Sequence, residues 1–325
     1  MKSLNVIDLF SGCGGFSYGF HKNKFNILEA YDFWYDATRT YKNNYPNTNV
    51  LNLDISRICF KPLRNKVHVL IGGPPCQPFS IVGKQKGNKD SRDMIPEYIR
   101  IVEELNPKIF ILENVLGLAT KKNESYLNQK LNELRALGYI LNFDVLDFRN
   151  WGVPQKRKRF ILIGSKDQLI PFPKPSVSQF VTLKEVFANH NYSGSNNTKI
   201  VFASNPKVGH SLSGSLLVNG KGRPLDMDSQ SNTITASGGN AVHFWDHDKY
   251  FQDYFNSLKA GGKIKAGECN IEKIRRLTFE ELKMIQTFPE DFKFFGADSS
   301  KIKQIGNSVP PKFSFELAKH IKQFL

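Results

Sequence analysis

Short apolar runs alternate with longer segments of mixed polarity along the first half of the chain. The apolar runs have the length of strands and are rich in Val, Ile, Leu or Phe; they lie at 4–10, 25–30, 67–71, 109–112, 141–145 and 160–163. Segments with helical spacing separate them, as at 95–105 and 126–137. Alternating strands and helices predict an α/β fold with a mostly parallel sheet covered by helices on both faces.

The pattern changes after Gly164. A proline-rich stretch at 171–176 reads as a linker, and 189–240 is rich in Ser, Asn and Gly, which predicts short strands joined by turns. Helical spacing returns at 278–285 and 311–324. We therefore predict a discontinuous α/β domain formed by 1–168 and 300–325, and a smaller strand- and loop-rich domain at 169–299.

Composition narrows the class of protein. Lys and Arg number 45 against 30 Asp and Glu, a net charge of +15, which favours a polyanionic partner, most simply nucleic acid; a basic surface without a dedicated partner is the alternative. The hydrophobic fraction of 40% excludes a disordered or collagen-like chain. No run is long enough to span a membrane, and Asp8 interrupts the N-terminal segment before a secretory signal could form.

Cysteine and histidine spacing gives no metal signal. The four cysteines contain no C-x-x-C pair, and His243 and His247 lack the glutamate of H-E-x-x-H. We therefore expect free thiols in a reducing compartment and no metal site.

Polar residues follow several strands, at the edge where an open parallel sheet binds its ligands. The first strand leads into Ser-Gly-Cys-Gly-Gly at 11–15, which lets the backbone approach a ligand closely, although its glycine spacing is not that of the dinucleotide fingerprint. Asp32 follows the second strand, where a carboxylate suits a ribose diol, and Asp54 follows a short run at 50–53. These positions predict a nucleoside-containing ligand that does not require a pyrophosphate.

The most informative stretch is GGPPCQPFS at 72–80. Its glycines permit a tight exit from the strand and its prolines stiffen the loop, which presents Cys76 where the sheet opens. We predict that Cys76 is a nucleophile; a small buried filler is the alternative.

Two further groups complete the candidate chemistry. Glu113 follows the run at 109–112, where burial would raise its pKa and allow it to donate a proton; an N-cap or a surface ion pair is the alternative. Strand alternation places Gln155, Arg157 and Arg159 on one face, as a donor array for an oxygen-rich ligand, with a solvated basic patch as the alternative.

Together these residues resemble the cytosine-C5 DNA methyltransferase family of prokaryotic restriction–modification type. DLFSGCGG at 8–15, GGPPCQPFS, ENV at 113–115 and Q-x-R-x-R at 155–159 match successive family motifs. The late motifs match at 276–289 and in QIGNSVP at 304–310, so the resemblance covers nearly the whole chain outside 170–270. The chain departs from the family where Asn-Glu-x-Asp often follows the second strand, because it has Tyr-Asp-Phe-Trp at 31–34.

The resemblance implies a Rossmann-like methyltransferase domain, a target recognition domain and a covalent mechanism. The thiolate of Cys76 would add to C6 of a cytosine flipped out of double-stranded DNA, and Glu113 would hold N3 and the exocyclic amine. Arg157 and Arg159 would stabilise O2 and the loop that carries the nucleophile, with Gln155 in the same catalytic set. The C5 carbon would take a methyl group from S-adenosylmethionine, leaving S-adenosylhomocysteine.

The same resemblance implies the binding residues. Asp32 would hold the ribose, with Glu29 as a competing candidate; Phe33 would stack on the adenine, and Met94 would lie beside the donor. The full donor set is Phe10, Ser11, Gly12, Cys13, Gly14, Gly15, Asp32, Phe33, Asp54, Ile55, Gly73, Pro75, Asn307, Ser308 and Val309. The expected DNA contacts are Ser80, Lys84, Lys86 and Lys89 in a mobile loop, and Lys221 and Arg223 near the anchor TITASGG at 233–239. For the segment 80–93, a disordered surface loop is the alternative.

The expected partner is double-stranded DNA, with a cognate restriction endonuclease acting separately. We expect no membrane contact and a monomeric, cytoplasmic enzyme of prokaryotic or viral origin that acts on nucleoid DNA. A nicotinamide oxidoreductase is disfavoured by the glycine spacing, and a non-catalytic homologue by the presence of Cys76 and Glu113. The tRNA-methylating branch of the family is disfavoured by the roughly 100 residues at 170–270, where that branch has a short region.

Overall fold

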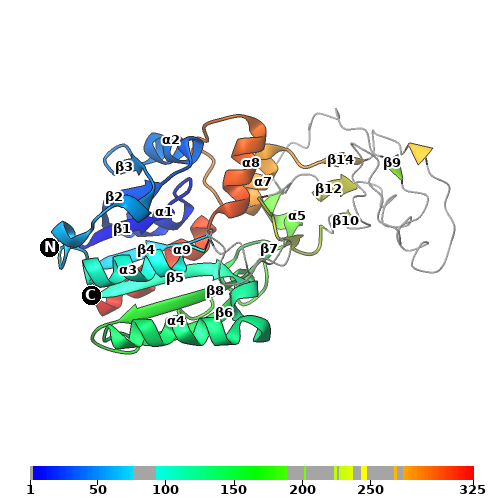
Figure 1. Cartoon of the computed structure of the whole chain (residues 1–325). Helices are drawn as coiled ribbons and strands as arrows, with labels where there is room; N and C mark the ends of the chain where they lie inside the picture. The colour runs from blue at the N-terminus through cyan, green and yellow to red at the C-terminus, as the bar shows by residue number, and fades with distance from the viewer. Residues whose placement is uncertain are drawn as a thin grey trace.

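The computed structural model describes residues 3–75, 93–188, 227–236 and 277–325, together with the backbone of short strands at 201–202, 223–224, 243–246, 267–268 and 274–276. Within these residues, a seven-stranded sheet has the order β3-β2-β1-β4-β5-β8-β6 (Figure 1). Its strands are β1 (Asn5–Leu9), β2 (Asn26–Asp32), β3 (Asn49–Asn52), β4 (Val69–Gly72), β5 (Ile109–Val115), β6 (Ile140–Asp147) and β8 (Lys158–Ser165).

The first five strands are parallel, and β8 runs antiparallel to both of its neighbours. This arrangement confirms the predicted α/β class with a mostly parallel sheet. The crossovers return each strand in the same direction, so the carboxyl ends of β1 to β5 meet at one edge.

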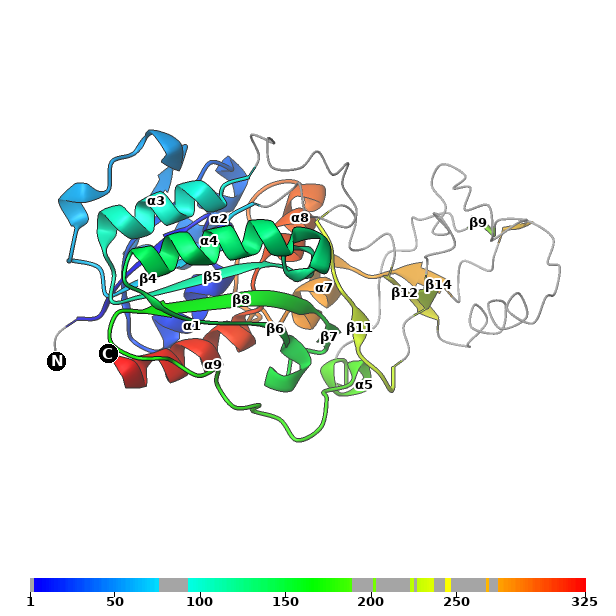
Figure 2. The same ribbon diagram turned by 60° about the horizontal axis from the view of Figure 1, so that its bottom comes forward.

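Strand alternation sorts the apolar side chains onto two buried faces, as expected for a sheet covered on both sides. In β5, Ile109 and Ile111 belong to one core cluster, whereas Phe110 and Leu112 belong to the other. The first cluster is covered by α1 (Gly15–Lys22) and α9 (Pro311–Ile321), and the second by α3 (Ile95–Leu105) and α4 (Glu124–Ala136) (Figure 2).

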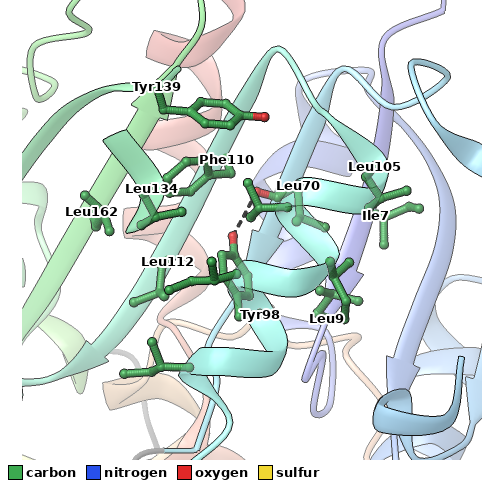
Figure 3. Close-up of a cluster of buried hydrophobic side chains, with 14 of the residues drawn as sticks. Ile7, Leu9, Leu70, Tyr98, Leu105, Phe110, Leu112, Leu134, Tyr139 and Leu162 are labelled. Carbon is green, nitrogen blue, oxygen red and sulfur yellow. Dashed lines mark hydrogen bonds between the residues drawn. The ribbon is translucent and has the colours of Figure 1, made fainter. Parts of the chain in front are cut away.

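Tyr98 fastens α3 to the strands beneath it. Its ring lies among the buried side chains of the second cluster, and its hydroxyl donates to the carbonyl of Ile111 at 2.9 Å and lies 3.4 Å from that of Leu70 (Figure 3). The Leu70 carbonyl lies near the end of β4, which leads into Gly73, and the Ile111 carbonyl lies two residues before Glu113 within β5. The packing of α3 therefore supports both strands that carry the candidate chemistry.

The C-terminal helix packs against the first helix of the chain. The Phe313 ring stacks on Phe148 with centroids 3.9 Å apart. Gly19 approaches α9 so closely that a Cβ there would lie 2.1 Å from the carbonyl carbon of Ser314. The Ser314 hydroxyl also donates to the carbonyl of Phe16. These contacts hold α9 along α1, the helix that begins at the first turn.

A third apolar cluster lies at the end of the sheet. It is built by α2 (Tyr35–Asn44), α5 (Leu183–Val186), α7 (Phe279–Ile285) and α8 (Asp298–Asn307). Figure 1 shows α7 and α8 between the large sheet and a three-stranded sheet of β10 (Arg223–Pro224), β12 (His243–Asp246) and β14 (Ile274–Arg276). Two-stranded pairings join β7 (Gln155–Lys156) to β11 (Ser231–Asn232), and β9 (Val201–Phe202) to β13 (Gly267–Glu268).

Short 3-10 helices complete the described chain: η1 (Ile55–Arg57), η2 (Lys61–Leu63), η4 (Leu116–Ala119), η5 (Lys121–Asn123), η6 (Phe148–Trp151) and η8 (Lys322–Phe324). None of the helices in the described ranges has the length and apolar character needed to cross a bilayer.

Candidate active site

The turn after β1 is shaped by glycines. Gly12 and Gly14 have φ angles of +53° and +92°, in the left-handed region, and Gly14 is the N-cap of α1. A Cβ on Gly15 would lie 1.9 Å from the Ser308 hydroxyl, whereas a Cβ on Gly12 would meet no described atom within 4 Å. The space beside Gly15 is therefore filled by the C-terminal part of the chain, whereas the described residues leave the space beside Gly12 open.

Asp32 links this turn to the end of β2. Its Oδ2 accepts a hydrogen bond from the Gly12 backbone N–H and its Oδ1 one from Trp34, each at 2.8 Å. Burial raises the pKa of Asp32, and the hydrogen bonds from the backbone oppose that shift. Glu29, the competing candidate, lies within β2 and accepts a hydrogen bond from the Tyr31 hydroxyl. Position at the strand end therefore favours Asp32.

An aromatic ring and a second carboxylate lie next to Asp32. Phe33 is 73% exposed, which is unusual for a large apolar side chain. The backbone N–H of Leu53 donates to the Asp32 carbonyl at 3.2 Å, so the Asp54 carboxylate follows the neighbouring strand end. Asp54 caps η1, and hydrogen bonds from Ser56 lower its pKa.

These residues fit an adenosine-containing group. Asp32 and Asp54 offer acceptors for hydroxyl groups, the exposed Phe33 ring offers a stacking surface, and the open side of Gly12 allows close approach of a ligand. In addition, the buried hydroxyl of Ser11 has no hydrogen-bond partner within the described residues. A ligand bound at this edge would supply the hydrogen-bond partner that the Ser11 hydroxyl lacks among the described residues.

The late residues of the chain reach the same turn. The Cys13 thiol contacts the carbonyl of Gln304 at 3.8 Å, and burial raises its pKa to about 12, so this thiol stays protonated. Ser308 packs against Gly15 and Val309 is buried beside it, whereas Asn307 is exposed at the end of α8. Phe10, with a φ angle of +54°, and the buried Ile55 complete the predicted donor set around this edge.

The loop that leads toward Cys76 is fixed beside β5. The Asn114 side-chain amide donates to the Pro74 carbonyl at 3.0 Å, and the Met94 backbone N–H donates to the Pro75 carbonyl at 3.1 Å. A Cβ on Gly73 would lie 3.2 Å from Glu113 Oε2. The predicted nucleophile, Cys76, lies outside the described residues, but the three residues before it are held against Glu113 and the start of α3.

Glu113 is paired with Arg159. Arg159 Nε lies 3.0 Å from Glu113 Oε1, and the two side chains are only 14% and 10% exposed. They project from neighbouring antiparallel strands, because Glu113 lies opposite Ile161 and Arg159 is two residues away on the same face. The ion pair anticipated as an alternative is therefore present, although it is buried rather than on the surface.

The predicted array of three donors is not formed, which corrects the interpretation of Gln155 and Arg157. Gln155 is buried and donates to the side chain of Gln286 at 2.7 Å. Arg157 is buried and its guanidinium donates to the carbonyls of Ile234, Gly306 and Ser308. Residue 157 lies between β7 and β8, so strand alternation does not extend across it. Of the three predicted donors, Arg159 is the one that pairs with Glu113.

Comparison with known proteins decides the family. The family model for C-5 cytosine-specific DNA methylase matches residues 4–323, nearly the whole chain. The chain belongs to this family. The Type II methyltransferase M1.HphI of Haemophilus parahaemolyticus is 31% identical over 331 residues, covering 98% of this chain and 87% of the relative. M.NgoPII of Neisseria gonorrhoeae is 31% identical over 334 residues, covering 99% and 96%.

Solved structures support the fold of this cytosine methylase. Spodoptera frugiperda DNMT2 superposes with a TM-score of 0.73 at 22% identity, covering 98% of this chain and 100% of that one. The Entamoeba histolytica methyltransferase EhMeth gives a TM-score of 0.71 at 18% identity, covering 100% and 99%. The Rossmann-like methyltransferase architecture predicted from the motifs is thereby confirmed.

Sequence reasoning missed a buried polar network beneath the glycine turn. The Ser17 hydroxyl donates to Asp8 Oδ2 at 2.6 Å, and the Tyr41 hydroxyl donates to Ser17 Oγ at 2.6 Å. Burial raises the pKa of Asp8 to about 8. The only sequence signal was an acidic residue inside the apolar run at 4–10; its partners come from two different helices.

The predicted DNA contacts fall where no side chain is described. Ser80, Lys84, Lys86, Lys89 and Lys221 lie outside the described residues, and Arg223 is described only as backbone in β10. Their roles stay predictions. In the described part of the chain, no group of His, Cys, Asp or Glu is arranged to hold a metal ion.

Proposed function

We propose that this C-5 cytosine-specific DNA methylase transfers a methyl group from S-adenosylmethionine to C5 of a cytosine in double-stranded DNA, through a covalent bond between Cys76 and C6. The observation that carries the proposal is the anchoring of Gly73–Pro75 against the Glu113–Arg159 pair. This pair lies at the same sheet edge as the residues that fit an adenosine-containing group. The residues that precede Cys76, the acidic group and the candidate donor site therefore lie at one edge of the sheet.

The chemistry explains why a thiol is needed. Cytosine C5 is a weak nucleophile, and the addition of a thiolate to C6 forms an S–C6 bond and moves electron density to C5. Methyl transfer then forms the C5–CH3 bond; loss of the C5 proton to a base and cleavage of the S–C6 bond restore the aromatic ring. When bound, S-adenosylmethionine supplies the methyl group and leaves as S-adenosylhomocysteine.

Glu113 and Arg159 have separate tasks in this proposal. Glu113 Oε2, which faces Gly73, would hold a proton at cytosine N3 while charge develops on the ring. Arg159 Nε holds Oε1 at 3.0 Å and so fixes the orientation of the carboxylate. Arg159 Nη1 donates to the Lys158 carbonyl at 2.9 Å, and Nη2 would lie near O2 of the base.

Asp32, Phe33 and Asp54 would bind the donor. The Asp32 carboxylate oxygens each accept one backbone hydrogen bond and retain a lone pair for a ribose hydroxyl. Phe33 would stack on the adenine, with its exposed ring covered on binding. The glycine turn would let the backbone approach the donor closely.

The DNA must present the cytosine outside the helix, because C6 is shielded in a stacked base. The net charge of +15 favours phosphate contacts, and we assign target recognition to the region 169–299. The relatives carry names of Type II methyltransferases, which supports a role in a restriction–modification system with a separate endonuclease.

Methylation of plasmid DNA tests this proposal. The purified protein is incubated with S-adenosylmethionine and plasmid, and the product is sequenced after bisulfite treatment. We expect 5-methylcytosine at one recurrent sequence, loss of the product in Cys76→Ala, and full activity in Cys59→Ala, which removes an exposed thiol. Absence of 5-methylcytosine with the wild type, or undiminished activity of Cys76→Ala, would contradict it; methylation of tRNA but not plasmid would redirect it to RNA.

A further inference from the structure

A segment of the predicted recognition region is built into the α/β body. Strand β11 pairs in parallel with β7, with Ser231 opposite Gln155. The Ser231 backbone N–H donates to the Pro154 carbonyl at 3.0 Å, and the Thr233 hydroxyl donates to the Lys156 carbonyl at 2.6 Å. The segment 231–236 is therefore fixed along the strand that precedes Arg157.

The Arg157 guanidinium joins this segment to the end of α8. Nη1 donates to the Ile234 carbonyl at 3.1 Å, and Nη2 donates to the carbonyls of Gly306 at 3.1 Å and Ser308 at 2.9 Å. The side chain is 1% exposed, and its Nε has no hydrogen-bond partner among the described residues. A planar, forked donor is required here, because one nitrogen alone cannot reach both segments.

Two glutamines hold the same junction from the other side. Gln155 Oε1 accepts a hydrogen bond from the Ile234 N–H at 3.0 Å, and its Nε2 donates to Gln286 Oε1. Gln286 Nε2 in turn donates to the Ser308 carbonyl at 2.7 Å. The N–H and C=O of Ile234 and the carbonyl of Ser308 are thus all bound by buried side chains.

The junction continues directly into the glycine turn. A Cβ on Gly306 would lie 2.4 Å from the carbonyl carbon of Thr235, so the two backbones are in contact. Two residues later, Ser308 packs against Gly15, at the position where a Cβ would lie 1.9 Å from its hydroxyl. A displacement of the 231–236 segment would therefore press on the donor site through residues 306–308.

We propose that Arg157 is a positioning residue that couples binding of the donor to engagement of DNA by the 231–236 segment. This inference rests on the proposed function, since it requires a donor site at the glycine turn and a DNA-binding role for the region 169–299. By thermodynamic linkage, DNA that engages the segment raises donor affinity by the same factor by which the donor raises DNA affinity. Coupling between two sites commonly amounts to about 5- to 150-fold.

The test measures the affinity of S-adenosylhomocysteine by calorimetry, without DNA and with a saturating duplex that contains the wild-type methylation site. In the wild type we expect DNA to strengthen binding at least fivefold, in the range of about 5- to 150-fold given above. In Arg157→Lys, which keeps the charge but not the fork, we expect the ratio to fall below about twofold. Arg64→Lys is the matched control, because Arg64 also donates to two backbone carbonyls, those of Glu103 and Glu104 in α3, but it is exposed.

Gly306→Ala tests the same coupling without replacing Arg157, since its methyl group would force the Thr235 backbone away. We expect the ratio of the two affinities to fall in this variant as well. It decides the matter if Arg157→Lys does not fold. A wild-type affinity ratio, with DNA against without DNA, that is near one would overturn the inference. An unchanged ratio in a folded Arg157→Lys protein with a lowered Tm would also overturn it and would leave Arg157 a structural role. If the wild type neither methylates DNA nor binds S-adenosylhomocysteine, the proposed function itself fails, and the two failures are thereby distinguished.

Discussion

Glu113 and Arg159 form a buried ion pair across β5 and β8, with Nε 3.0 Å from Oε1. Each residue alone would leave a charge uncompensated at the edge of the sheet. Their pairing also leaves the other carboxylate oxygen facing Gly73, on the loop that leads to the predicted nucleophile. The pair is therefore at once a structural contact and the centre of the proposed chemistry.

Removing Arg159 should cost both stability and activity. In Arg159→Ala the buried Glu113 carboxylate loses its partner, and we expect the free energy of unfolding to fall by about 3–5 kcal/mol. We expect kcat to fall by about 10²-fold or more, because the carboxylate loses its orientation. Urea denaturation and methylation kinetics measure the two effects.

A double-mutant cycle separates these effects. Glu113→Gln in the Arg159→Ala background removes the unpaired charge, so part of the lost stability should return while kcat stays at least as low as in Arg159→Ala. If Arg159→Ala methylates DNA at the wild-type rate, the assigned role of the pair is wrong.

The two ends of the glycine turn should respond differently to alanine. Gly15→Ala places a methyl group 1.9 Å from the Ser308 hydroxyl and 2.5 Å from the Val309 carbonyl, so we expect a large drop in Tm. Gly12→Ala meets no described atom and suffers only its φ angle of +53°, a cost of about 1–2 kcal/mol. If the open side of Gly12 receives the donor, this folded variant should bind S-adenosylhomocysteine at least tenfold more weakly. Unchanged affinity would place the donor elsewhere.

Asp8 should make the protein less stable as the pH rises. Burial raises its pKa from 3.8 to about 8, so between these values the folded state keeps a proton that the unfolded state has released. The stability contribution of Asp8 is therefore fully present below pH 4 and is lost as the pH rises toward 8. Asp8→Asn, which still accepts from Ser17, should remove this decline.

The midpoints of urea denaturation at pH 5 and pH 7.5 give the difference in stability between the wild type and Asp8→Asn at each pH. We expect Asp8→Asn to gain stability relative to the wild type as the pH rises. Asp54→Asn is the control, because hydrogen bonds lower the pKa of Asp54 from 3.8, so its contribution is lost only as the pH falls below that value and should not change between pH 5 and pH 7.5. A parallel pH dependence in Asp8→Asn and the wild type would contradict the assigned burial.

The local pattern of apolar and polar residues was sufficient to predict the strands and helices that form the sheet edge. The helix predicted at 95–105 coincides with α3, and each predicted apolar run overlaps a strand of the large sheet. The reason is physical: strands buried on both faces are apolar throughout, and helices over them keep one apolar stripe. Asp32, the last residue of β2, and Glu113, near the end of β5, lie close to one edge because parallel strands end at the same edge.

The role of Arg157 could not be predicted in the same way. Its acceptors are backbone carbonyls that lie 77 to 151 residues further along the chain. Because every residue has a backbone carbonyl, the residue types do not indicate which carbonyls accept these bonds. Alternation within one strand says which way a side chain points, but not which segment covers it. The network around Asp8 was hidden for the same reason, since Ser17, which donates to Asp8, and Tyr41, which donates to Ser17, come from two helices.

The central claim is that Cys76 bonds to cytosine C6 beside Glu113, and a trapping experiment tests it most directly. A duplex with 5-fluorocytosine at the methylated position lacks the proton whose loss releases the enzyme, so the adduct should persist after methyl transfer. We predict a complex stable to denaturing gel electrophoresis that requires S-adenosylmethionine, maps to the peptide containing Cys76, and is absent in Cys76→Ala but retained in Cys59→Ala. Turnover of the fluorinated duplex without a covalent complex, or a complex on another residue, would contradict the account.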